Sequence, residues 1–330
     1  MGYDGKLLSR AAEALEQRSA LHERELDARA QTLEARFPRL REIDTLLRRS
    51  VIQAINAALS SGADAGAHVR EQQARNAALR QERAAILEKN GFPAGFLDRE
   101  PMCPYCADTG YTTQGMCVCL RALYQEEHLR ELTYATGMPP SYFKDIDLSL
   151  FSEERAGTSR ISARENMRYI IHVCRAFLEE RGAHGNLFFS GPPGTGKTFT
   201  AVCLAYSAAE QGISVLYESA GRLMAKYEDA RFHREDEAAK SDISRCEACD
   251  LLILDDLGTE MTTSVSNAGL YQLLNTRLTA GRACVFLTNQ SYEELRRRYP
   301  PQVLSRLEGE FEALRFFGGD IRKNKRVNFY

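Results

Sequence analysis

Residues 191–198 constrain the fold of this chain more than any other segment, because their glycine spacing demands a particular backbone path. They read Gly-Pro-Pro-Gly-Thr-Gly-Lys-Thr, and they lie between the apolar stretch 186–190 and a predicted helix over residues 199–211. Glycines let the backbone curl so that successive N–H groups point at phosphate oxygens, and the helix N-terminus adds partial positive charge. Strand, loop and helix together predict a phosphate-binding loop.

Two side chains of this loop would act directly on a nucleotide. Lys197 supplies a positive charge for the β- and γ-phosphates, and Thr198 offers a hydroxyl to Mg²⁺. A glycine-rich turn without a ligand is the alternative interpretation, but the flanking strand and helix favour a nucleotide site. ATP and Mg²⁺ are therefore the expected ligands. The residues expected to bind them are Gly191, Pro192, Pro193, Gly194, Thr195, Gly196, Lys197, Thr198 and Asp255.

A second motif, Asp-Leu-Leu-Ile-Leu-Asp-Asp, covers residues 250–256. Its four apolar residues predict a buried central strand, whose carboxyl end delivers two acids to the crevice where open α/β sheets bind ligands. Asp255 is placed to hold Mg²⁺ through water, and Asp256 to orient or deprotonate the attacking water. Aspartate reaches less far than the glutamate common at the second position in AAA+ proteins, so the hydrolysis rate stays open. A strand that merely ends in two solvated acids is the alternative.

Three residues further along the chain complete the expected catalytic set. Asn289 ends the apolar stretch 284–289, where it can hydrogen-bond the γ-phosphate or the lytic water, although asparagine is also an ordinary turn residue. Arg306 and Arg322 carry planar, permanent charges suited to a developing phosphoryl charge. We expect Arg306 to reach the ATP of a neighbouring subunit and Arg322 that of its own, unless both are ordinary surface arginines. The predicted catalytic residues are Asp256, Asn289, Arg306 and Arg322.

Four of the nine cysteines cluster within residues 103–119, as Cys-Pro-Tyr-Cys and Cys-Val-Cys. Two close pairs with a short loop between them can close a tetrahedral site of four thiolates, and zinc suits thiolates that need no redox activity. An iron–sulfur cluster and free cysteines are the alternatives. His128 is a further candidate ligand, although a lone helical histidine is more often exposed. The predicted zinc ligands are Cys103, Cys106, Cys117 and Cys119.

Composition bounds the class of protein and its location. The 330 residues include 44% hydrophobic ones, enough for a sizeable core in two domains or slightly more. No apolar run approaches the roughly 18 residues of a membrane span, and the charged N-terminus is unlike a signal peptide, so we expect a cytoplasmic protein. The remaining five cysteines are scattered, and the pair at 246 and 249 is interpreted as core packing because no second pair accompanies it.

Changes in residue composition and spacing divide the chain into four regions. Residues 1–90 carry apolar side chains at helical spacing, which predicts three helices, and such helices suit either a coiled-coil spacer or a surface for partner docking. Residues 91–130 form the cysteine knuckle, and residues 131–185 are a linker with a connector helix over 162–180. From 186 to 330 short apolar strands alternate with helices, which predicts an α/β fold with a largely parallel sheet.

Taken in order, these motifs resemble a known family. The helical N-terminus is followed by Cys-Pro-x-Cys-x-Asp-Thr-Gly-Tyr, the phosphate loop, Leu-Leu-Ile-Leu-Asp-Asp-Leu-Gly, Leu-Thr-Asn, Ser-Arg-Leu and Phe-Phe-Gly-x-Asp-Ile-Arg. The chain resembles bacterial replicative helicase loaders of the DnaC/DnaI type, and especially their zinc-bearing DnaI-like branch. The resemblance is specific over residues 91–330 and rests on helical character alone over residues 1–90.

The resemblance implies a fold, a partner and a set of roles. It implies an AAA+ P-loop core with a reduced lid, preceded by a helical region that binds the hexameric replicative helicase. It also implies self-association into a ring or spiral through ATP interfaces, and loading of the helicase onto single-stranded DNA at replication initiation or restart. ATP binding and hydrolysis would act as an assembly and release switch. In family terms Asn289 is sensor 1, Arg306 the arginine finger and Arg322 sensor 2.

Two other functions compete with this one. Transposition helper ATPases of the IstB type share the ATPase core and would act with a transposase on DNA. Their N-terminal region is expected to be short, whereas residues 1–185 precede the core here, which favours the loader. A scaffold that binds ATP only as a structural ligand is the third candidate, and the intact Asp255 and Asp256 pair together with Arg306 argues against it.

Overall fold

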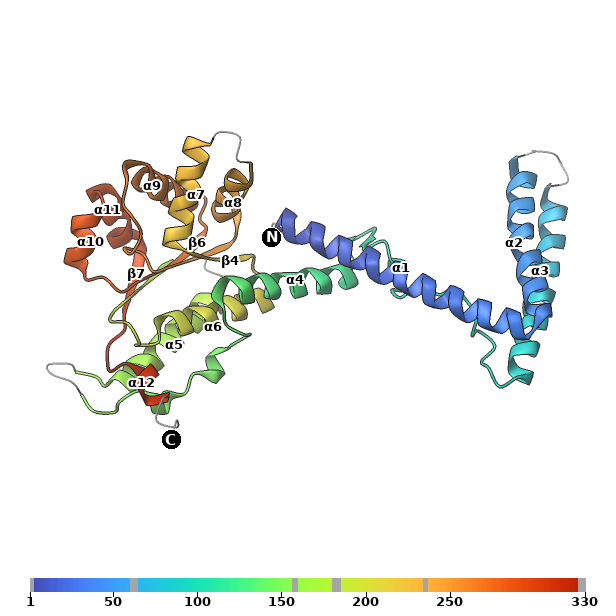
Figure 1. Cartoon of the computed structure of the whole chain (residues 1–330), viewed down its shortest axis with the longest axis horizontal. Coiled ribbons are helices and arrows are strands. Elements are labelled where there is room, and N and C mark those ends of the chain that lie inside the picture. The colour runs from blue at the N-terminus through green and yellow to red at the C-terminus, as the bar shows by residue number, and fades with distance from the viewer. Residues whose placement is uncertain (1–2, 60–64, 156–159, 180–184, 234–236, 326–330) are drawn as a thin grey trace. The chain divides into compact units, whose positions relative to one another are not determined.

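The computed structural model describes residues 3–59, 65–155, 160–179, 185–233 and 237–325 (Figure 1). The chain divides into two compact units. One unit combines residues 1–11 with residues 122–330 and contains a large sheet; we call it the sheet unit. The other, residues 12–121, is the helical unit. None of the helices in the described ranges is both long and apolar enough to cross a membrane.

The sheet unit is built on five strands in the spatial order β4-β5-β6-β3-β7, and every neighbouring pair is parallel. The strands over residues 251–255 and 283–288 are buried at every position, because an inner strand of a parallel sheet is covered on both faces. The predicted α/β fold with a parallel sheet is therefore confirmed. The strands are β3 (Asn186–Ser190), β4 (Val215–Ser219), β5 (Leu251–Asp255), β6 (Ala283–Thr288) and β7 (Phe311–Arg315).

Helices cover both faces of this sheet, as Figure 1 shows. Alternate strand residues point to opposite faces, so Leu187 and Phe189 join one hydrophobic core while Phe188 contacts the other. Helices α5 (Ala163–Glu179) and α6 (Lys197–Glu210) supply the first core. The second core is supplied mainly by α7 (Ala220–Phe232), α8 (Glu237–Ala248), α9 (Ser264–Thr279), α10 (Tyr292–Arg298) and α11 (Pro301–Glu310). A short α12 (Ile321–Lys325) follows β7.

The region predicted as a linker, residues 131–185, differs from that description. It contains the 3₁₀ helices η1 (Phe143–Asp145) and η2 (Leu148–Leu150) and contributes buried side chains to the first core, among them Phe143 and Phe151. The hydroxyl of Tyr206 on α6 donates to the carbonyl of Met138 at 2.9 Å. The segment is thus an integral layer of the sheet unit, because its scattered aromatic residues pack against α6.

The first residues of the chain also belong to the sheet unit. Arg245 on α8 donates from Nε to Asp4 at 2.6 Å and from Nη2 to Glu131 at 2.7 Å. Glu131 lies on α4 (Val118–Thr136), which also carries His128. His128 is buried, and its Nε2 lies 2.8 Å from the carbonyl of Val215, so the expectation of an exposed or metal-binding histidine is wrong. Burial lowers the pKa of its imidazole.

The helical unit contains most of the three predicted N-terminal helices. They are α1 (Gly5–Arg36), whose first turns lie in the sheet unit, α2 (Pro38–Leu59) and α3 (Ala65–Lys89). Leu33, Leu40 and Leu87 form a small shared core, and Phe37 and Phe92 pack against it. A hairpin of β1 (Tyr111–Thr112) and β2 (Gly115–Met116) follows. Most other side chains described on these helices are exposed, because charged residues occupy the remaining faces.

Candidate functional site

The phosphate loop joins the end of β3 to the start of α6 and depends on its glycines. Gly191, Gly194 and Gly196 have φ angles of 145°, 79° and 96°, a region that other residues rarely adopt. A Cβ atom on Gly194 would lie 2.0 Å from Oδ1 of Asp320, and one on Gly191 would lie 2.0 Å from a backbone oxygen. Both backbone angle and space therefore require glycine where the sequence places it.

Lys197 opens α6 and is the cation of this loop. Its Nζ donates to the carbonyls of Gly191 at 2.6 Å and Pro192 at 2.8 Å, and only 5% of the residue is exposed. Burial lowers the pKa of the ammonium to about 8, against the opposing effect of the Asp255 and Asp256 carboxylates. The loop carbonyls hold the amine inside the loop, where a phosphate would restore its full charge.

Asp255 is the buried end of β5 and is fixed by two hydrogen bonds. Its Oδ1 accepts the backbone N–H of Asp256 at 2.8 Å, and its Oδ2 accepts the hydroxyl of Tyr217 on β4. Burial and the adjacent carboxylate raise the pKa of Tyr217, which keeps the phenol a donor. Tyr217 was not among the residues predicted from the sequence; the available signal was a tyrosine on the strand that runs beside the acidic one.

Asp256 and Asn289 meet at the carboxyl ends of β5 and β6, as expected of neighbouring parallel strands. Nδ2 of Asn289 donates to Oδ1 of Asp256 at 3.0 Å, and both residues are exposed. Partial burial of the carboxyl group and the neighbouring Asp255 charge raise the pKa of Asp256, while Lys197 opposes that shift. An accessible carboxylate held by an amide and near a lysine is suited to orienting a water molecule.

Lys197, Asp256 and Asn289 open onto one cavity of about 410 Å³, which Arg322 reaches from α12. The N–H of Ile321 donates to the carbonyl of Gly194 at 2.9 Å, and this bond between backbone groups ties α12 to the loop. The Arg322 charge lowers the pKa of Lys197 and that of Asp256, as expected of a cation in the same cavity.

Most of the predicted nucleotide and catalytic residues line this cavity. They are Pro193, Gly194, Gly196, Lys197, Thr198, Asp256, Asn289 and Arg322. Four others shape the loop and the strand end without lining the cavity, through the hydrogen bonds of their backbone or side chains: Gly191, Pro192, Thr195 and Asp255.

The cavity is also lined by residues that were not predicted from the sequence. They come from the region predicted as a linker and combine apolar side chains with two carboxylates: Met138, Asp145, Ile146, Asp147, Leu150 and Phe151. An apolar lining with a few polar groups, in the same cavity as a phosphate loop, suits a nucleotide base. The signal was the apolar residues after Gly137, but nothing local indicates that they would face the loop.

The structure describes all four predicted catalytic residues. Three of them line this cavity, and Arg306 does not. It lies on the exposed side of α11, with 44% of its side chain accessible, and its Nη1 is 3.7 Å from Oε1 of Glu310. An exposed pair of this kind contributes little to stability, so the arginine can exchange partners easily. A role of Arg306 toward a neighbouring chain stays a prediction.

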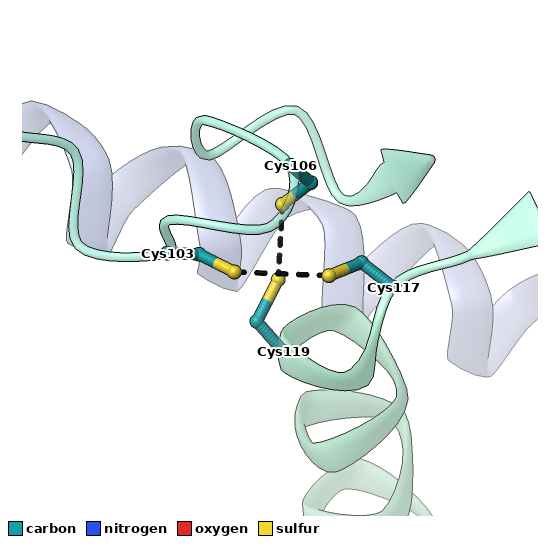
Figure 2. A group of neighbouring side chains, drawn as sticks. All are labelled: Cys103, Cys106, Cys117 and Cys119. Atoms are coloured by element: carbon teal, nitrogen blue, oxygen red, sulfur yellow. Dashed lines mark hydrogen bonds between the residues drawn. The ribbon is translucent and has the colours of Figure 1, made fainter. Parts of the chain in front are cut away.

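The four clustered cysteines converge in the helical unit, and Figure 2 shows their sulfur atoms pointing toward one another. All four Sγ atoms lie within 4.8 Å of each other. Cys103 is 3.7 Å from Cys117 and Cys106 is 3.4 Å from Cys119, measured between Sγ atoms. Zinc–sulfur bonds of about 2.3 Å in a tetrahedron place sulfurs about 3.8 Å apart, so the donor set fits a zinc ion.

The loop around the cysteines is shaped by its own hydrogen bonds and backbone angles. The Asp108 carboxylate accepts the backbone N–H groups of Met102 at 2.9 Å and Cys103 at 2.7 Å. Ala107 and Asp108 adopt φ angles of 47° and 62°, which turns the chain between the pairs. Backbone hydrogen bonding from Cys106 lowers the pKa of the Cys103 thiol to about 7. The cluster can therefore hold a metal ion.

The second cysteine pair of the chain lies elsewhere. Cys246 and Cys249 are buried in the second core of the sheet unit, as predicted. Burial raises the pKa of both thiols, which keeps them protonated. These two residues therefore serve as core packing.

Comparison with known proteins gives the nucleotide site a context. Residues 173–306 match the family described as IstB-like ATP binding protein. The replicative helicase loader DnaC of Escherichia coli K12 is 26% identical over 144 residues, which is 43% of this chain and 58% of DnaC. The insertion sequence ATP-binding protein y4pL of Sinorhizobium fredii is 30% identical over 150 residues, 44% of this chain and 59% of that protein.

The matches are partial. The chain spans less than two thirds of the length of these curated relatives. A solved structure of DnaI is similar with a TM-score of 0.44 and 18% identity, covering 57% of this chain and 94% of that chain. The sheet unit therefore contains a segment, residues 173–306, that is similar to the ATP-binding domains of IstB and DnaC proteins. The resemblance inferred from the motifs is thus confirmed at low identity.

Proposed function

We propose that this chain is an ATP-dependent loader of the replicative DNA helicase onto single-stranded DNA, with ATP binding and hydrolysis as its assembly and release switch. The observation that carries the proposal is the helical unit of residues 12–121 that accompanies the ATP-binding domain. The domain itself is about equally similar to DnaC and to an insertion sequence protein, so it does not separate the two functions. A loader needs a second surface for the helicase, and the helical unit offers one.

The nucleotide site supports an ATP hydrolysis cycle through this chain's own groups. Lys197 would hold the β- and γ-phosphates, since its amine already lies inside the loop. Mg²⁺ would be held by Thr198 and, through water, by Asp255, and it would neutralise phosphate charge there. Asp256 would orient the attacking water with the help of Asn289, to which it is hydrogen-bonded. Arg322 would contact the nucleotide from α12.

A second copy of the chain would complete the nucleotide site. Arg306 is exposed on α11 outside its own cavity, where it could reach the ATP of a neighbouring chain. ATP bound at such an interface would favour self-association, and its hydrolysis would release the contact. This gives the ring or spiral assembly a direct dependence on nucleotide.

The four cysteines would hold a structural zinc ion through Cys103, Cys106, Cys117 and Cys119. The ion would link the turn before β1 to the first turn of α4, because the second cysteine pair straddles the start of that helix. The apolar core described in the helical unit is small, so a metal would contribute much of the stability of this loop.

A capture experiment tests the function. The full chain, immobilised with ATP and Mg²⁺, should retain the replicative helicase of its host and should not retain an IstB-partner transposase. A chain beginning at Ala122 is the control: it keeps the buried Tyr124 and His128 but loses Asp4, which accepts a hydrogen bond from Arg245. Binding of an ATP analogue should show that its sheet unit still folds, and it should lose the helicase. A start near Leu132 would remove both buried residues. Capture of a transposase in place of the helicase would establish the alternative, a transposition helper.

A further inference from the structure

The turn after β5 holds Asp256 in an uncommon backbone conformation. Its φ angle is +58°, in the left-handed region that aspartate visits at some cost. The carbonyl of Asp256 accepts the N–H of Thr259 at 3.2 Å and its hydroxyl at 2.8 Å. The N–H of Leu257 donates to the carbonyl of Leu287 on β6 at 2.8 Å. The direction of the Asp256 carboxylate therefore depends on how firmly this turn is held.

Glu260 closes the turn from within. Only 6% of the residue is exposed, and both oxygens of its carboxylate accept hydrogen bonds. Oε2 accepts the N–H of Gly258 at 2.9 Å, and Oε1 accepts the hydroxyl of Tyr299. A buried carboxylate is costly unless its hydrogen bonds are made, so this arrangement is stable only while the turn keeps its shape.

The same glutamate ties the turn to the end of α10. Arg298 donates to the carbonyl of Glu260 through Nη2, and Tyr299, which follows α10 directly, bonds its carboxylate. Tyr299 is 4% exposed, and burial together with the Glu260 carboxylate raises the pKa of its hydroxyl, so it stays a donor. Two residues later α11 begins, the helix that carries Arg306.

We infer that Glu260 is a positioning residue for ATP hydrolysis, holding Asp256 in its reactive orientation and connecting that orientation to the helix that bears Arg306. The inference rests on the proposed function, because it requires Asp256 to act on the lytic water. Glu260 lies outside the set of cavity-lining residues, so we expect its loss to reduce hydrolysis more than nucleotide affinity. Contact of Arg306 with the ATP of a neighbouring chain would thus affect the orientation of Asp256 in its own chain.

Steady-state hydrolysis and nucleotide binding by the full chain test this role. Glu260→Ala should reduce kcat by about tenfold to a hundredfold, the size expected when a reacting group moves by about 1 Å. Binding of a non-hydrolysable ATP analogue should stay near the wild-type value, which also shows that the variant is folded. Glu260→Gln should recover most of the rate, because its amide can still accept from Gly258 and pair with Tyr299. Tyr299→Phe should give an intermediate loss.

A matched control is Glu294→Ala, which removes a glutamate that accepts the N–H of Ser291 at 2.6 Å at the exposed start of α10. It should leave kcat unchanged. Equal losses in kcat and in analogue affinity for Glu260→Ala, or a wild-type kcat in that variant, would overturn the positioning role while leaving the ATPase function in place. A Glu260→Gln variant as slow as Glu260→Ala would also overturn it. Absence of ATP turnover in the wild-type chain would instead overturn the proposed function, and the inference with it.

Discussion

The cysteine cluster and the nucleotide cavity are both sites for charged ligands, yet the chain builds them in different ways. The cluster draws its four thiols from residues 103–119 and shapes them with a local loop and a two-residue-strand hairpin. The cavity draws residues from 138 to 322, and they meet only because parallel strands end at one edge of a sheet. A local site depends on its ligand for stability, whereas a site on a sheet is preformed by the core beneath it.

This difference predicts that the two sites respond in opposite ways to the loss of a ligand or of a side chain. Loss of the ligand should unfold the cysteine loop, because the cysteines are themselves the buried cluster of that loop. Loss of a side chain in the nucleotide cavity should weaken function and leave the fold intact, because β5 and β6 beneath the cavity residues Asp256 and Asn289 are buried at every position. Four experiments test this difference between the two sites.

The largest effect is expected from the double substitution Cys103→Ser and Cys106→Ser. Structural zinc sites contribute roughly 10 kcal/mol or more to local folding, so the loop should lose its ordered structure. Elemental analysis should find one zinc ion per wild-type chain and none in the variant, while ATP-analogue binding is unchanged. Iron in place of zinc would identify a different cluster, and a parallel loss of ATP binding would show that the two sites are not independent.

Arg306→Ala should have the next largest effect. An arginine supplied across an interface can be worth roughly a thousandfold in turnover, so hydrolysis should nearly vanish while ATP affinity is kept. Mixing this variant with Asp256→Asn should restore part of the activity, because each supplies what the other lacks. Wild-type turnover in Arg306→Ala would make it a surface residue, and a dead mixture would place the arginine within its own site.

Lys197→Ala should weaken ATP binding at least tenfold. A charged hydrogen bond to phosphate in a partly buried loop is worth more than about 1.4 kcal/mol. Titration with a fluorescent ATP analogue measures the change, and the melting temperature should move little because the sheet core is untouched. Undiminished binding would remove Lys197 from the nucleotide site.

The smallest effect is a pH dependence of nucleotide binding. The pKa of Lys197 is lowered to about 8 by burial, so its charged fraction falls as pH rises above that value. Phosphate binds the charged form, so affinity should drop about fivefold between about pH 8 and pH 9, with proton uptake on binding. Lys197→Met should lose this dependence. Zinc content should not change across this range, which separates the two sites once more.

Local sequence determined the positions of several helices and strands, although the chain has only low identity to its relatives. The strand predicted at residues 186–190 is β3, and the helix predicted over 162–180 is α5, within one residue at each end. Apolar runs and helical spacing are local signals, so they can be read without the fold. The glycines of the phosphate loop and the spacing of the cysteines are local in the same sense, and their geometry agrees with the motif.

Tertiary structure alone decided which distant residues share a site. Tyr217 on Asp255, Glu260 on the turn of Asp256, and the segment around Phe151 in the cavity all depend on contacts between elements that packing brings together. The position of a residue in the repeat of a strand or helix indicates the face on which it lies, but not which residue of another element it contacts there. For the same reason, the segment 131–185, which was predicted as a linker, contributes residues to the core. Burial depends on how the whole chain packs, so local sequence does not determine it.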